Sequence, residues 1–136
     1  MTIFALDTNI ISYILKERVH VISCVRKALI EGNKLIIPPL VYYEVRRGLL
    51  SKDTPIQTAS FNKFCQQIPI GKMEHKMLDK AAQIYASLRL QSRPIDDADI
   101  LIAAFCIENA YTLVTNNTKH FEGIDGLKLV NWAESK

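Results

Sequence analysis

The chain has 136 residues, of which 49% are apolar and 23% charged, as in an ordinary globular domain with its own core. No apolar run approaches the roughly 18 residues that cross a bilayer, and no basic segment precedes the first apolar run, which is too short for a signal peptide. We therefore expect one domain over residues 1–136 in a cytoplasmic protein without a membrane span. The formal net charge of +3 permits a polyanionic ligand without requiring one.

The first ten residues, MTIFALDTNI, join a short apolar run to a polar triplet. The run Ile3–Leu6 does not alternate with polar residues, which is typical of a strand buried on both faces. Asp7-Thr8-Asn9 then resembles the start of a helix, because Asp, Thr and Asn are good N-caps. Ligands of open α/β sheets bind beyond the carboxyl ends of the strands, which is where Asp7 is expected.

The rest of the chain alternates between helical and strand patterns. In chain order we expect helices over 8–16 and 19–30, a strand over 34–37, helices over 39–50 and 56–65, a short strand or connector over 68–70, helices over 74–90 and 96–108, a strand over 112–115, a turn over 116–118 and a strand over 127–132. This alternation predicts a parallel sheet with helices on both faces.

Cysteine and histidine spacing gives no metal or disulfide pattern. The cysteines are few and widely spaced, and no CxxC pair occurs, which favours reduced thiols. The histidines fall on unrelated predicted elements, so we expect surface or helix-edge positions for them: His20, His75 and His120. No GxxxxGK[ST] or GxGxxG loop is present. Tyr42 and Tyr43 could stack on bases, but packing is the favoured interpretation.

Acidic residues occur at places where a core would favour apolar ones. Asp7 follows the first strand, Glu44 lies at the edge of an apolar helix stripe, and Asp99 directly precedes ILIAA, with Asp97 two residues earlier. Buried like charges are costly unless a cation neutralises them. Oxygen ligands without His or Cys nearby in sequence favour Mg²⁺ or Mn²⁺, which usually binds phosphate.

Each acid also has a purely structural explanation. Asp7 could cap a helix, Glu44 could pair with Arg47 one turn away, and the acids at 96, 97 and 99 suit the positive end of a helix dipole. Only their joint placement at one sheet edge favours a site.

Five segments, LDTNI, YYEVRRG, DADILIAAFC, LVTNNTKHF and GLKLVNW, occur in an order that resembles the PIN-domain ribonucleases, specifically VapC-type toxins of toxin–antitoxin pairs. The resemblance implies a five-stranded, mainly parallel α/β/α sheet and Mg²⁺- or Mn²⁺-dependent RNA cleavage in the cytoplasm. It also implies inhibition by a VapB-type antitoxin and a homodimer. Exposed apolar residues on the early helices, such as Ile11, Ile14 and Tyr42, could serve either interface.

The resemblance also implies roles for individual residues. The family's catalytic acids match Asp7, Glu44 and Asp99. Asp7 and Asp99 match the metal ligands, with Asp97 and Glu44 as further candidates. A fourth position, acidic in some PIN domains, falls on Asn117, which implies fewer charges around the cation. The family's supporting polar positions match two further residues: Asn9 and Thr115.

Other functions remain open on the sequence. A PIN-like binding module without catalysis would use the same fold, and a nuclease acting on DNA would use the same acids. A phosphoaspartate phosphatase would need a second Asp two residues after Asp7, where this chain has Asn9.

Overall fold

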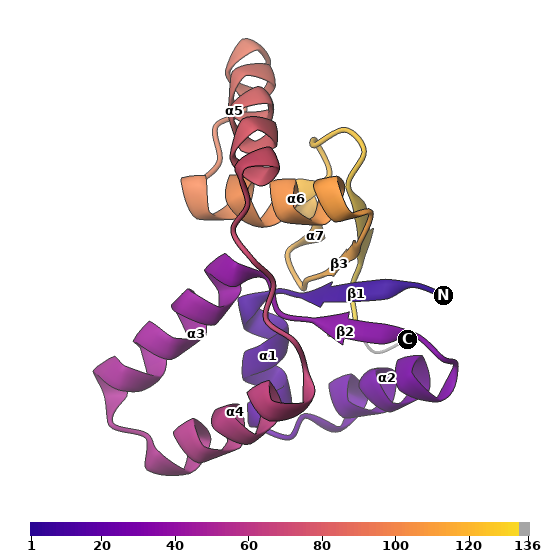
Figure 1. Ribbon diagram of the computed structural model, residues 1–136, viewed down its shortest axis with the longest axis vertical. Coiled ribbons are helices and arrows are strands. Elements are labelled where there is room, and N and C mark those ends of the chain that lie inside the picture. Colours follow the sequence, from indigo (N-terminus) through magenta and orange to yellow (C-terminus); the bar gives the residue numbers. More distant parts are fainter. Residues whose placement is uncertain (134–136) are drawn as a thin grey trace.

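The computed structural model describes residues 1–133, in which a parallel sheet is flanked by helices (Figure 1). The elements in chain order are β1 (Ile3–Leu6), α1 (Thr8–Leu15), α2 (Val19–Ile30), β2 (Lys34–Ile36), α3 (Pro39–Lys52), α4 (Pro55–Gln67), α5 (His75–Leu90), α6 (Asp97–Asn109), β3 (Thr112–Val114), α7 (Thr118–Phe121) and β4 (Lys128–Val130). The predicted alternation of strands and helices is confirmed.

The sheet has the strand order β2-β1-β3-β4, and all neighbouring strands are parallel. In its register Ala5 lies beside Ile36 on one side and Leu113 on the other, which makes β1 a central strand. This position explains why the IFAL run does not alternate with polar residues. Because every strand runs the same way, all four carboxyl ends lie at one edge of the sheet.

The implied fifth strand is absent from the described residues, which hold four. The segment 68–70 forms only an isolated parallel bridge between Ile70 and Ile37. Its two hydrogen bonds run from the Ile37 N–H to the Pro69 carbonyl at 2.9 Å and from the Gly71 N–H to the Ile37 carbonyl at 2.7 Å. Pro69 has no amide hydrogen to donate, which limits the ladder to this bridge.

Several boundaries differ from the sequence predictions by one or two residues; for example, α3 ends at Lys52 and α4 covers Pro55–Gln67. Near the C-terminal end, the last strand covers only Lys128–Val130, and the short helix α7 follows the turn where only a turn was predicted. α7 has four residues, too few for hydrophobic periodicity to reveal it.

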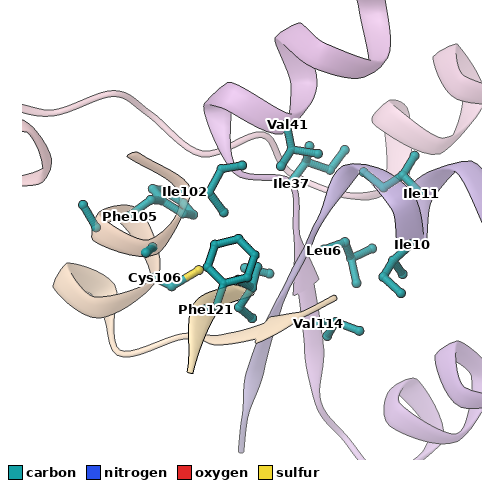
Figure 2. Packing of buried hydrophobic residues seen from close by; sticks show 14 of the residues in the cluster. Leu6, Ile10, Ile11, Ile37, Val41, Ile102, Phe105, Cys106, Val114 and Phe121 are labelled. Atoms are coloured by element: carbon teal, nitrogen blue, oxygen red, sulfur yellow. The ribbon is translucent and has the colours of Figure 1, made fainter. Parts of the chain in front are cut away.

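The core surrounds α6, whose ILIAAFCI segment is buried on most of its surface. Figure 2 shows Ile102, Phe105 and Cys106 of this helix on one side of the core and Leu6, Ile10, Ile11 and Val114 on the other. The prediction that Ile11 is exposed was wrong: it is fully buried, because α1 turns this side chain into the core. Ile14 and Tyr42 are half-buried against the same core, and the Tyr42 ring packs on Phe61. No helix in residues 1–133 has both the length and the apolarity to span a membrane.

Gly71 provides a test of how tightly the connector packs. A Cβ atom at this position would overlap the ring of Phe105, which is buried and cannot easily move. We expect Gly71→Ala to lower the free energy of unfolding by about 1–3 kcal/mol, measured by urea denaturation. Gly48→Ala is the matched control, since a Cβ there meets nothing within 4 Å and Ala is the better helix former. That control should gain about 0.5–1 kcal/mol, and a Gly71 variant as stable as wild type would contradict the packing.

Candidate active site

Asp7 lies at the centre of the carboxyl edge of the sheet. It is 5% exposed, and with Thr115 it makes up the buried polar residues of the described chain. Its backbone N–H donates to the Val114 carbonyl at 2.9 Å, which continues the pairing of β1 with β3. Its side chain caps α1 by accepting from the Thr8 N–H at 2.8 Å, and its other oxygen accepts from the Thr115 hydroxyl at 2.7 Å. Asp7 is therefore both a helix cap and a fixed carboxylate.

Glu44 reaches the same edge from α3, which packs against α1. Its Oε1 accepts a hydrogen bond of 2.7 Å from the Thr8 hydroxyl, so one residue links Glu44 to the cap made by Asp7. The alternative pairing with Arg47 spans 3.9 Å, and the Arg47 side chain is 60% exposed. An ion pair this long and this exposed contributes little. The contact with Thr8 is thus the one that orients Glu44.

Asp99 lies in the first turn of α6 and is half-buried. Its Oδ2 lies 2.9 Å from Nε2 of His120, the third residue of α7. His120 has a partly exposed position on a short helix, as predicted, but its contact with Asp99 was not predicted. No spacing pattern in the sequence could have shown the pair, since 20 residues of helix, strand and turn lie between them.

The carboxylates influence one another, as their pKa shifts show. Burial raises the pKa of Asp7 above its usual value; hydrogen bonds from Thr115 and Thr8 oppose this shift, and the charges of Asp99 and Glu44 add to it. Burial also raises the pKa of Asp99, opposed by His120. The structure therefore brings Glu44 and Asp99 within electrostatic reach of Asp7.

The remaining predicted residues divide into two groups. Asn9 accepts from the Asn116 N–H at 3.2 Å, and the Asn117 N–H donates to the Thr115 hydroxyl at 3.1 Å, so both support the turn that follows β3. Asp97 is exposed and is not among the charges that shift the pKa of Asp7 or Asp99.

These residues suit a hard divalent cation. Carboxylates that repel one another in a partly buried site gain most from a bound positive ion. No three acidic, His or Cys side chains within residues 1–133 form a ready-made cage. Mg²⁺ needs no such cage, because it keeps several waters and uses one or two carboxylates. Asp7 and Asp99, with Glu44 nearby, match that requirement.

The fold and this acidic edge together define a class of proteins, the parallel α/β domains with a carboxylate site at the ends of their strands. Within that class the chain belongs to the PIN domain family, whose family model matches residues 4–127.

Known proteins resemble it over nearly its full length. Ribonuclease VapC1 of Haemophilus influenzae (strain R2866) is 25% identical over 97% of this chain and 99% of its own. The tRNA(fMet)-specific endonuclease VapC of Shigella flexneri is 28% identical over 96% of this chain and 98% of its own. The structure of VapBC2 from Rickettsia felis bound to a promoter DNA fragment matches with a TM-score of 0.90 and 27% identity, covering 96% of this chain and 99% of that chain.

Asp7→Asn tests the electrostatic strain in the site. The variant removes a buried charge facing two others, and the amide oxygen can still accept from the Thr8 N–H. In chelator, we expect the free energy of unfolding to rise by about 0.5–2 kcal/mol at neutral pH, measured by urea denaturation.

The pH dependence of this gain follows from the raised pKa. The folded wild type binds a proton on Asp7 more readily than the unfolded chain does, so it loses stability as pH rises from the ordinary value of 3.8 through the raised folded value. The Asp7→Asn variant has no titrating group at this position and so does not lose stability in this way. The difference between variant and wild type should therefore grow over that range and then level off; a variant no more stable than wild type at neutral pH would contradict the strain.

Proposed function

We propose that this chain is a Mg²⁺- or Mn²⁺-dependent endoribonuclease, the toxin of a VapBC-type toxin–antitoxin pair, formed by a single PIN domain over residues 1–136. The observation that carries the proposal is the meeting of Asp7, Glu44 and Asp99 at the carboxyl edge of the sheet. The relatives support it, since they are named ribonucleases or an RNA-specific endonuclease over almost the whole chain.

Asp7 and Asp99 hold the cation, and Asp97 and Glu44 are further candidates as ligands through water. When bound, the ion offsets the negative charge that develops on the scissile phosphate. Thr115 and Thr8 fix the two oxygens of Asp7 and so determine where its lone pairs point. Asn9 and Asn117 support the neighbouring turn.

Glu44 orients the attacking water and accepts its proton. Thr8 occupies Oε1 of Glu44 and holds the carboxylate in place, which leaves Oε2, 3.9 Å from the Arg47 guanidinium, for the water. The water oxygen forms a bond to phosphorus, its proton passes to Glu44, and the bond from phosphorus to the 3′ oxygen breaks in line. The 3′ oxygen leaves with the bonding electrons and takes a proton from solvent, so the products carry a 5′-phosphate and a 3′-hydroxyl.

A VapB-type antitoxin is the proposed protein partner and inhibitor. The Rickettsia felis neighbour is a VapBC2 complex, and its toxin-like chain shares this fold over nearly its whole length. Homodimer formation is part of the same proposal. Both interfaces must use surfaces other than Ile11, which is buried within the chain.

Digestion of total cellular RNA tests the activity. Purified protein with Mg²⁺ should produce discrete fragments with 5′-phosphates, and chelator should abolish them. Asp99→Asn should lower the rate by about 100-fold or more, because it removes a proposed cation ligand. Asp125→Asn, an exposed acid on the loop before β4, is the control and should cleave like wild type. Cleavage of DNA alone, or cleavage unaffected by chelator, would overturn the proposal.

Cation binding has its own readout in thermal unfolding. Mg²⁺ or Mn²⁺ at a hundredfold excess over its dissociation constant should stabilise wild type by about 2.7 kcal/mol. Asp7→Asn and Asp99→Asn should lose most of this shift, and Asp125→Asn should keep it. Equal shifts in all four proteins would mean that the cation binds elsewhere.

A further inference from the structure

A cavity of about 210 Å³ adjoins the acidic site, between α1, α3 and the start of α4. Thr8 and Glu44, which form the 2.7 Å hydrogen bond described above, line part of it. The remainder extends away from the site toward the C-terminal ends of α1 and α3. We call this cavity the α1/α3 groove. Figure 1 shows these two helices and α4 next to one another.

Positively charged side chains line the part of the groove that lies farther from the acids. Lys16, which follows α1, and Lys52, the last residue of α3, both line it and are exposed. The salt bridges within residues 1–133 involve other residues, so neither lysine is neutralised by a carboxylate there. A bound anion would therefore find two cationic side chains with no competing internal partner.

The groove also contains an unsatisfied polar atom. The Thr54 hydroxyl oxygen is buried and, among the described residues, is the buried side-chain oxygen or nitrogen that lacks a hydrogen-bond partner. This oxygen is enclosed by the protein, so a buried water rather than a bound ligand is the partner it requires. Ser12 and Gln57 add further hydrogen-bonding groups to the same walls.

Gly48 keeps the groove open. It lies inside α3, where glycine is less favourable than alanine, and a Cβ atom there would meet nothing within 4 Å. Neither a positive φ nor close packing requires glycine at this place. The missing side chain instead leaves free space along the wall of the groove between Glu44 and Lys52.

We propose that the α1/α3 groove binds the single-stranded RNA segment next to the scissile phosphate. Lys16 and Lys52 contact its backbone phosphates, and Ser12 and Gln57 offer hydrogen bonds to the nucleotide. Single strands suit a narrow, positively charged groove of this kind. The proposal rests on the proposed ribonuclease function and adds the surface that positions the substrate. The two lysines, which no carboxylate pairs within residues 1–133, favour a polyanion over an apolar protein segment.

Binding of a single-stranded oligoribonucleotide of mixed sequence, labelled with fluorescein, tests the RNA-binding role of the groove. Binding is measured by fluorescence anisotropy in the presence of chelator. Every protein carries Asp99→Asn, which prevents cleavage. Adding Lys16→Gln and Lys52→Gln should weaken binding about 10-fold and reduce the slope of log affinity against log salt by about 1.4, the value for two lost single-strand phosphate contacts. The control is Lys34→Gln with Lys128→Gln. These exposed lysines begin β2 and β4, at the opposite edge of the sheet, and their loss changes the net charge equally. The control should bind within about twofold of the parent.

Gly48→Leu provides a second, uncharged test. Its side chain should fill the groove and weaken RNA binding by a similar factor. In a protein with Asp99 intact, the thermal shift caused by Mg²⁺ should remain, because the acids are untouched. Gly48→Ala, which adds one methyl group, serves as the folding control.

The outcomes separate this proposal from the activity itself. If wild type cleaves RNA and both groove variants bind and cleave like it, the groove proposal fails while the ribonuclease stands. If those variants lose only antitoxin binding, the groove belongs to a protein partner and the proposal is overturned. If wild type neither binds nor cleaves RNA, the proposed function has failed first.

Discussion

The arrangement of this site depends on one buried carboxylate. Asp7 ends the central strand β1, begins α1 through its bond to the Thr8 N–H, and holds β3 through the Thr115 hydroxyl. Moving it would disturb a strand end, a helix start and a neighbouring strand together. Thr8 then extends the same network to Glu44 on α3. The geometry of the acids is thus fixed by the hydrogen bonds that end β1 and start α1.

The core keeps the third acid in place by a different route. Asp99 is at the start of α6, and the following turns of this helix are buried on most sides, with α5, α3 and β3 as the principal neighbours. A helix packed this completely can neither rotate nor slide without opening cavities. The half-buried Asp99 therefore keeps its position although, within residues 1–133, His120 is its only side-chain partner. Rigid packing replaces here the hydrogen-bond network that holds Asp7.

The sequence predicted the parts of this structure that depend on local pattern. Asp7 was found because a buried strand stops at a polar triplet, and Glu44 because it interrupts the Val41, Val45 stripe of α3, which is buried as expected. The contact of His120 with Asp99 depends instead on how α6 and α7 pack, which no local pattern records. The same holds for Ile11, whose burial depends on how α1 packs against the core, and for the bridge at Ile70.

The distribution of charge around the site bears on how an acidic site in a protein of low net charge can accept a polyanionic substrate. Without a cation, Asp7, Glu44 and Asp99 repel a phosphate, and Glu44 and Asp99 also repel Asp7, whose pKa is raised mainly by burial and further by their charges. Lys16 and Lys52 lie along the adjoining groove, at a distance from the acids. Their positive charge can attract an RNA strand without neutralising the negative charge of the acids. Under the proposed function, a backbone held by the lysines would reach the acids only when a cation neutralises them. Separating the two charges along one groove would thus make close approach of RNA conditional on the metal.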